Sequence, residues 1–287
     1  MKVLITGISS SLGILIARRL SKNHEIIGIS TRTLKEFKTI KFDLGSDKSL
    51  MIEPVDVCIH LAFITDANKC ENDPYAYKVN ILGTKNVLNY CKRNKVKKFI
   101  LGSTGGVYGF SKKLLKENME AHPYNAYASM KYQAEQMAKK YSSYFDVVVL
   151  RYFFPYGPET KEDSLINNLI NNVRKGKKII LHKDGKPAIN PIFVEELVEA
   201  TSLFCLKKFK GFNIFNIAGP EKASIKEIIL MISSIIGKGP VFEPSGKVFG
   251  DMVGDINKLQ DYHKPKIGLR QGLKITINNL KQNELKK

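Results

Sequence analysis

Short runs of consecutive apolar residues alternate with longer stretches in which apolar positions recur every three or four residues. The short runs are typical of buried strands, and the longer stretches are typical of amphipathic helices. The predicted strands span residues 2–6, 25–29, 39–42, 55–61, 97–101 and 146–152. The predicted helices between them span residues 14–20, 74–93 and 127–140. Strands and helices in this alternation form βαβ units, so the pattern predicts an α/β fold with a Rossmann-type doubly wound parallel sheet.

The pattern is less regular after residue 154. It predicts helices over residues 165–175 and 225–236, strands over 178–181 and 213–217, and a last helix from about Leu269. We therefore expect a dinucleotide-binding Rossmann domain over residues 1–154 and a smaller substrate-binding lobe over residues 155–287. Some segments of the second part are expected to cross back to the first.

The composition is that of an ordinary globular protein, with 43% hydrophobic and 25% charged residues in 287. The four cysteines form no regular framework, which is typical of reduced thiols in the cytosol. The five histidines are scattered, so we expect no metal site. No apolar run approaches the roughly 20 residues of a membrane helix, and the chain enters a strand-like run directly after Lys2. These features predict a cytoplasmic protein without a signal peptide or a membrane partner.

The formal net charge of +19 suggests either an anionic partner or a general lysine bias. The lysines are spread along the chain, and no nucleic-acid-binding motif is present. We therefore expect no nucleic-acid partner, although a phosphate-bearing small molecule would suit the charge.

A glycine turn follows the first predicted strand. Gly7 would allow a tight turn and Gly13 a close approach of helix to strand, while Ser10 and Ser11 stand where a middle glycine is usual. A strand, a tight turn and a helix start in this order can hold a pyrophosphate on helix amides. The second strand ends in Ser30 with Arg32 two positions later, instead of an acidic residue that would hold a ribose hydroxyl. An arginine can accept a 2′-phosphate, so this end favours NADP(H) over NAD(H).

Two stretches carry candidate chemistry. Tyr127 and Lys131 are four residues apart in a predicted helix, which puts them on one face. A nearby ammonium favours the phenolate, and a phenol tuned in this way can exchange protons with an alcohol or a carbonyl. Ser103 and Thr104 follow the fifth strand, at the edge where parallel sheets bind ligands.

These stretches together resemble the extended short-chain dehydrogenase/reductases, in particular the nucleotide-sugar-modifying NAD-dependent epimerase/dehydratase family. The resemblance runs nearly end to end. It is carried by the order and spacing of Thr6-Gly7…Gly13, Asp43-Leu44, His60-Leu61-Ala62, Asn80-x-x-Gly83-Thr84, Ser103-Thr104-x-x-Val107-Tyr108-Gly109, Tyr127-x-x-x-Lys131, Leu150-Arg151-Tyr152-Phe153…Tyr156-Gly157-Pro158, Ile192-x-Val194-Glu195-Glu196 and Asp255-Ile256-Asn257-Lys258.

The resemblance implies an NAD(P)-dependent enzyme that acts on a nucleotide-activated sugar, commonly as a homodimer. Tyr127 would be the general acid and base, and Lys131 would lower the pKa of Tyr127 and bind the nicotinamide ribose. Thr104 would polarise the substrate oxygen, with Ser103 alongside. The catalytic residues are thus expected to be Thr104, Tyr127 and Lys131.

The glycine turn, the strand ends and the resemblance together predict the contacts with the cofactor and the substrate. The expected cofactor-binding residues are Gly7, Ser10, Ser11, Leu12, Gly13, Ser30, Thr31, Arg32, Asp43, Leu44, Leu61, Ala62, Phe63, Asn80, Tyr127, Lys131, Tyr152 and Phe153. The expected substrate-binding residues are Ser103, Thr104, Phe154 and Asn190. Phe154 departs from the family, which often has asparagine there, and Ile189-Asn190 stand where Arg-Asp is frequent.

Other departures narrow the expected reaction. Dehydratases of the family carry an acidic pair directly after the catalytic threonine, and Gly105 and Gly106 stand there, so dehydration is not expected. No cysteine falls at a motif position, so oxidation to an acid is not expected either. A 4-keto-sugar reductase and a 4-epimerase with tightly bound NAD remain, and Ser30 and Arg32 favour the reductase. A non-catalytic dinucleotide sensor is a third alternative, although such proteins typically lose the tyrosine or the lysine.

Overall fold

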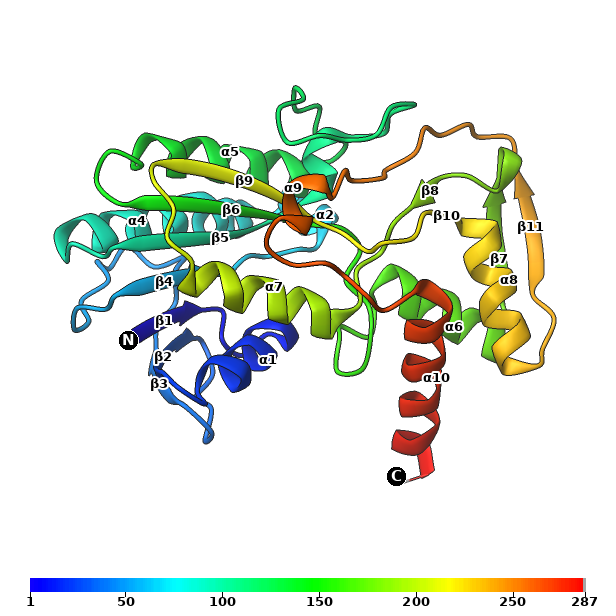
Figure 1. Cartoon of the computed structure of the whole chain (residues 1–287), viewed down its shortest axis with the longest axis horizontal. Helices are drawn as coiled ribbons and strands as arrows, with labels where there is room; N and C mark the ends of the chain where they lie inside the picture. Colours follow the sequence, from blue (N-terminus) through cyan, green and yellow to red (C-terminus); the bar gives the residue numbers. More distant parts are fainter. Residues whose placement is uncertain (286–287) are drawn as a thin grey trace. The chain divides into compact units, whose positions relative to one another are not determined.

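The structure is a computed structural model that describes residues 1–285. Its main element is a seven-stranded sheet with the strand order β3-β2-β1-β4-β5-β6-β9 (Figure 1). The strands are β1 (Lys2–Thr6), β2 (Glu25–Ser30), β3 (Lys38–Lys41), β4 (Val57–His60), β5 (Lys98–Thr104), β6 (Asp146–Tyr152) and β9 (Phe212–Ile217). The pairs from β3 through β5 are parallel. This order confirms the predicted Rossmann-type doubly wound sheet.

The strands are apolar because both faces of the sheet are covered. Each residue of β4 and nearly every residue of β1, β2, β5 and β6 is buried. In the centre of the sheet, Leu4 lies opposite Ile27 on one side and Cys58 on the other. The direction of winding reverses between β1 and β4, and ligands of such sheets bind beyond the carboxyl ends of the strands at this point.

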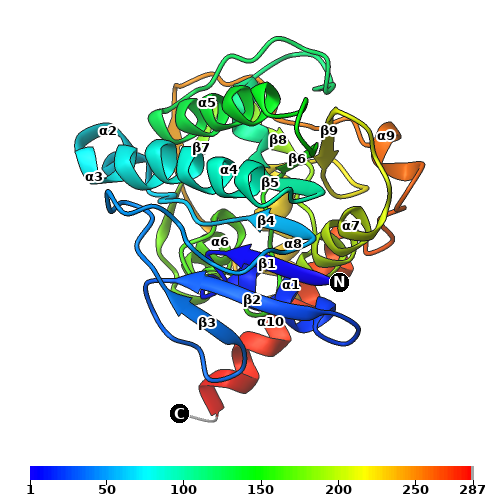
Figure 2. The ribbon, with the colours of Figure 1, turned by 90° about the vertical axis from the view of Figure 1, so that its left-hand side faces the viewer.

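Helices α4 (Gly83–Arg93) and α5 (Ala126–Lys140) lie side by side on one face of this sheet, and α1 (Ser11–Leu20) lies on the opposite face (Figure 2). The core under α4 and α5 is contiguous and includes Leu4, Val87, Phe99, Ala134 and Val149. Since these side chains come from both strands and helices, burial of this core fixes the ends of β5 and α5 relative to each other.

The single helix predicted over residues 74–93 differs in the structure. After α2 (Ala67–Asn72), the chain forms α3 (Pro74–Tyr77), a π-helical segment η1 (Lys78–Leu82) and then α4. The π segment carries Asn80, whose side chain is fully buried. Single-turn π segments of this kind often occur at functional sites. The apolar periodicity runs through all three helices, so it cannot indicate the change of pitch.

The chain forms two compact units. The first consists of residues 1–107, 121–151 and 198–215, and the second of residues 108–120, 152–197 and the part from Asn216 onward. The expected division into two domains near residue 154 stays a prediction. The remaining elements are η2 (Gly105–Tyr108), α6 (Leu165–Lys175), β7 (Lys178–His182), η3 (Lys183–Gly185), β8 (Ala188–Ile189), α7 (Val194–Leu206), β10 (Ala223–Ser224), α8 (Ile225–Ile236), β11 (Val241–Ser245), α9 (Asn257–Gln260) and α10 (Leu269–Leu285).

Two small sheets, β10–β8 and β11–β7, lie in the second unit. Across residues 1–285, none of the helices combines the length and the apolar character needed to cross a lipid bilayer.

Candidate active site

The glycine turn after β1 has a backbone that side chains would obstruct. Gly7 has φ +70°, and a Cβ there would lie 2.7 Å from the Ala62 nitrogen. A Cβ on Gly13 would lie 2.4 Å from the Gly7 carbonyl oxygen. The Ser10 hydroxyl accepts a hydrogen bond from the Gly13 N–H at 3.0 Å and thereby caps α1. The turn therefore brings the amino end of α1 close to the ends of β1 and β4, an arrangement that fits a pyrophosphate.

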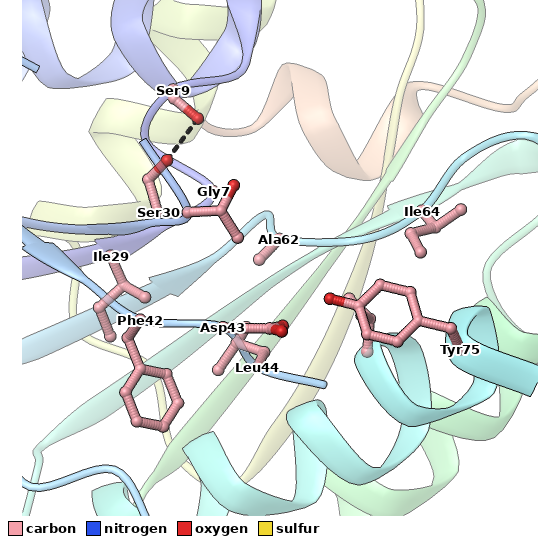
Figure 3. Close-up of a pocket in the computed structure, with 12 residues that line it drawn as sticks. Gly7, Ser9, Ile29, Ser30, Phe42, Asp43, Leu44, Ala62, Ile64 and Tyr75 are labelled. Atoms are coloured by element: carbon pink, nitrogen blue, oxygen red, sulfur yellow. Dashed lines mark hydrogen bonds between the residues drawn. The ribbon is translucent and has the colours of Figure 1, made fainter. Parts of the chain in front are cut away.

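A pocket of about 310 Å³ adjoins this turn (Figure 3). Six of its lining residues are predicted cofactor contacts: Gly7, Ser30, Thr31, Asp43, Leu44 and Ala62. Six others were missed by sequence reasoning: Ser9, Ile29, Phe42, Ile64, Tyr75 and Val79. Five of the missed residues lie directly next to a predicted one, and this proximity could have indicated them. Tyr75 comes from the helices after β4, where no local pattern separates a pocket residue from a core or surface residue.

Ser30 and Arg32 are bound to the glycine turn. The Ser30 hydroxyl donates to Ser9 Oγ at 2.6 Å and accepts from the Arg32 N–H at 3.0 Å. The Arg32 Nη2 donates to the Ser9 carbonyl oxygen at 3.4 Å. Thr31 lines the pocket, whereas Arg32 is not among its lining residues in the described part of the chain. The Arg32 guanidinium is therefore hydrogen-bonded to the glycine turn, which weakens the argument that Arg32 binds a 2′-phosphate.

The far end of the pocket pairs a carboxylate with a phenol. Asp43 accepts a hydrogen bond from the Gly45 N–H at 2.8 Å. The Tyr75 hydroxyl points toward Asp43 (Figure 3), and its hydrogen-bonding interaction with that carboxylate raises the pKa of Tyr75. Asp43 and Leu44, expected to contact the cofactor, thus line a pocket with both polar and apolar walls.

A buried polar network supports the segment after β4. The Asn80 side chain accepts from the Ile64 N–H at 2.7 Å and donates to the Ile64 carbonyl at 3.1 Å. Because the Thr84 hydroxyl donates to the Asn80 carbonyl at 2.6 Å, it accepts the proton of His60 Nε2 at 2.9 Å. His60 Nδ1 then accepts from Thr6 Oγ1 at 2.7 Å. Burial lowers the pKa of His60 to about 3, so the ring is neutral.

Asn80 was expected to contact the cofactor. Its amide is bonded to the Ile64 backbone, which favours a supporting role for a residue of the pocket wall, and its predicted contact with the cofactor stays a prediction.

The structure brings Lys131 and Tyr127 together with the end of β5. Lys131 Nζ donates to the Gly102 carbonyl at 2.6 Å and lies 3.8 Å from the centroid of the Phe63 ring. The Phe63 ring in turn meets the Tyr127 ring edge-on, with centroids 6.0 Å apart. Thr104 Oγ1 accepts from the Gly106 N–H at 3.1 Å. A phenol, an ammonium and a hydroxyl from α5 and β5 thus belong to one compact unit.

Burial dominates the electrostatics of the tyrosine and the lysine. Burial raises the pKa of Tyr127, with nearby Tyr124 and Cys70 acting in the same direction. Burial also lowers the pKa of Lys131 to about 7, against the opposing charge of Glu135. Loss of hydration is the largest cause of both shifts, because both groups are removed from water. The expectation that Lys131 lowers the pKa of Tyr127 stays a prediction.

Four predicted site residues belong to the second unit. Tyr152 and Phe153 are buried, and Phe153 packs against Tyr108 with centroids 6.3 Å apart. Phe154 has φ +46°, a conformation that asparagine adopts more readily than phenylalanine. The Asn190 amide donates to the Gly219 and Gly254 carbonyls and accepts from the Gly254 N–H, so it is committed to the backbone. This arrangement favours a structural role for Asn190, and its predicted contact with substrate stays a prediction.

Comparisons with known proteins agree with this geometry. The model of the NAD dependent epimerase/dehydratase family matches residues 3–218. The "Uncharacterized UDP-glucose epimerase YtcB" of Bacillus subtilis is 27% identical over 95% of this chain and 96% of its own. The human dTDP-D-glucose 4,6-dehydratase is 30% identical over 80% of this chain and 70% of its own.

A solved structure of the UDP-glucuronic acid 4-epimerase from Bacillus cereus, in complex with UDP-glucuronic acid and NAD, has a similar fold. Its TM-score is 0.88 at 26% identity, and the match covers 99% of this chain and 100% of that one. The family model alone covers most of the chain. The chain is therefore a member of the NAD-dependent epimerase/dehydratase family of enzymes, within the extended short-chain dehydrogenase/reductases.

Proposed function

We propose that this enzyme is an NAD-dependent 4-epimerase of a UDP-linked sugar. The observation that carries the proposal is that Thr104, Tyr127 and Lys131 belong to one compact unit, with Gly105 and Gly106 directly after Thr104. These groups suit proton exchange with a sugar hydroxyl, and the two glycines offer no acid or base for elimination. The B. subtilis and B. cereus relatives, both described as epimerases of UDP-sugars, support it. The 4-keto-sugar reductase expected from Ser30 and Arg32 has less support, because Arg32 is bound to the glycine turn.

The proposed roles follow from the position of each group. NAD bound in the pocket beside the glycine turn would supply reversible hydride transfer at the sugar carbon. Tyr127 takes the proton of the hydroxyl on that carbon and gives it back, while the Thr104 hydroxyl hydrogen-bonds the same oxygen. Because burial disfavours the phenolate, the Lys131 ammonium is needed nearby to stabilise it. Phe63 and the Gly102 carbonyl hold that ammonium in place.

The positions after Thr104 argue against a dehydratase, although a dehydratase is among the relatives. Elimination of water needs an acid and a base on the sugar, and Gly105 and Gly106 offer neither. The space is also restricted, because a Cβ on Gly106 would lie 2.8 Å from the Tyr124 ring and 3.3 Å from Thr104 Oγ1. An acidic side chain at residue 106 would have to displace Tyr124.

The proposal includes NAD as the cofactor. The B. cereus enzyme and the structure described as "MoeE5 in complex with UDP-glucose and NAD" both hold NAD, and the expected preference for NADP finds no support in them. A homodimer remains part of the proposal as a family expectation, and light scattering after size-exclusion chromatography would test it.

Identification of the bound dinucleotide and of the reaction product distinguishes an epimerase from a reductase. The purified protein is denatured, any released dinucleotide is identified, and the native protein is incubated with UDP-glucose, UDP-glucuronic acid and UDP-N-acetylglucosamine. We expect retained NAD and a C4 epimer of at least one sugar, formed without net change in absorbance at 340 nm. Tyr127→Phe should abolish turnover and keep the dinucleotide. Stoichiometric NADPH oxidation with a 4-keto sugar, and no epimer, would refute the proposal.

A further inference from the structure

One turn along α5 from Lys131 lies a buried ionic cluster whose charged members, Glu135 and Arg151, have no role in the proposed function. Glu135 is 0% exposed, and Arg151 on β6 and Ser103 on β5 are almost as deeply buried. Arg151 donates to both carboxylate oxygens, with Nη2 2.6 Å from Oε2 and Nε 3.1 Å from Oε1. The Ser103 hydroxyl donates to Oε1 at 2.5 Å. One carboxylate thus joins a helix to two neighbouring strands.

A buried charged pair contributes little net stability, because loss of hydration offsets most of its attraction. Stability alone therefore does not explain why Glu135 and Arg151 are buried at this place. Ser103 directly precedes Thr104, and Glu135 is on the same helix as Tyr127 and Lys131. Together with the hydrogen bond from Lys131 to the Gly102 carbonyl, the cluster links the strand end that carries the threonine to the helix that carries the tyrosine and the lysine.

We propose that Glu135 is a positioning residue for the reaction: its carboxylate, oriented by Arg151 and Ser103, keeps the Lys131 ammonium charged and aligns β5 with α5. The proposal rests on the catalytic role of Lys131 under the proposed function.

The groups around Lys131 support this role for Glu135. Cys70 on α2 has a raised pKa, Tyr127 on α5 has a raised pKa, and His60 on β4 has a lowered one, so all three are neutral near pH 7. Glu135 supplies a negative charge that opposes the loss of hydration of Lys131. Phe63 and the Gly102 carbonyl add partial negative charge and no full one.

The direct test measures the pKa of Lys131. The protein is labelled with 13C at the lysine ε-carbons, and the chemical shift of Lys131 is recorded by NMR as a function of pH. The Lys131 signal is assigned by its loss in Lys131→Arg. We expect Glu135→Gln to lower the pKa of Lys131 by about one unit or more, since an opposite charge within reach shifts a pKa by 1–3. Glu135→Asp keeps the charge and should restore most of the shift.

Two further variants keep the test decisive. Glu135→Gln leaves Arg151 without its carboxylate and could unfold. The double variant Glu135→Gln/Arg151→Met removes both charges and avoids this unpaired guanidinium. The double variant should also lower the pKa of Lys131. Ser103→Ala removes a hydrogen bond and no charge, and the pKa should stay near its wild-type value. An unchanged pKa in both glutamine variants, or an equal fall in Ser103→Ala, would overturn the proposal.

The NMR measurement needs no substrate, so it stands even if the proposed epimerase activity is absent. Where activity is found, the basic limb of kcat against pH should move to lower pH in Glu135→Gln with KM nearly unchanged. An unmoved limb would overturn the link between Glu135 and catalysis.

Discussion

Replacing Lys131 with methionine should stabilise the protein, and by more at low pH than at high pH. Burial holds the pKa of Lys131 near 7 instead of its ordinary value of 10.5. Between these two values the unfolded chain binds a proton that the folded protein lacks, so the stability of the wild type rises with pH. At 1.36 kcal/mol per pH unit, the rise from about pH 6 to about pH 9.5 is on the order of 3 kcal/mol.

Lys131→Met lacks this titration. The difference in the free energy of unfolding between the variant and the wild type should therefore be largest near pH 6, and smaller by about 3 kcal/mol near pH 9.5. Methionine keeps the length of the side chain and needs no hydration, and removal of a strained functional group commonly stabilises a protein. Glu135 keeps its bonds to Arg151 in the variant, which limits the charge left without a partner.

The assay is urea unfolding at both pH values, with the free energy of unfolding taken by linear extrapolation after removal of bound dinucleotide. Lys140→Met is the matched control, because Lys140 is exposed on the same helix and should show no pH-dependent difference. A difference between Lys131→Met and the wild type that is constant with pH, or that grows as pH rises, would refute the reasoning.

Three other substitutions test the pocket. Gly7→Ala should destabilise the protein by about 2 kcal/mol or more and abolish retention of NAD, because a positive φ is combined with a steric clash. Gly211→Ala is the control, since Gly211 has a similar φ but open space around it. This control should lose only about 1 kcal/mol of stability and leave NAD bound. Asn80→Asp should lower stability by about 1–3 kcal/mol in thermal unfolding, since it removes the donor to the Ile64 carbonyl; an unchanged melting temperature would contradict that role. Arg32→Ala should weaken NADH and NADPH equally in fluorescence titrations, and a selective loss of NADPH would restore the argument for NADP.

Several features of this protein were determined by the sequence alone. The strands from β1 through β6, the glycine turn and the shared face of Tyr127 and Lys131 could be predicted because each depends on local periodicity or spacing. The order of the motifs along the chain also predicted the family, which the family model confirms.

Other features were decided only by the tertiary structure. The place of Tyr75 in the pocket and the π segment around Asn80 depend on which segments meet after folding. The same is true of Arg32, whose guanidinium could be read as a phosphate ligand until its bond to the Ser9 carbonyl was known.

The charge state of the site was also decided at this level. Four-residue spacing brings an ammonium near a phenol, but the direction of each pKa shift depends on how much water the surrounding strands and helices exclude. That exclusion raises the pKa of Tyr127 and lowers that of Lys131, and it comes from residues far apart in the chain. Glu135 reads as one more polar helical position in the sequence, and only the approach of β5 and β6 turns it into a buried partner of Ser103 and Arg151.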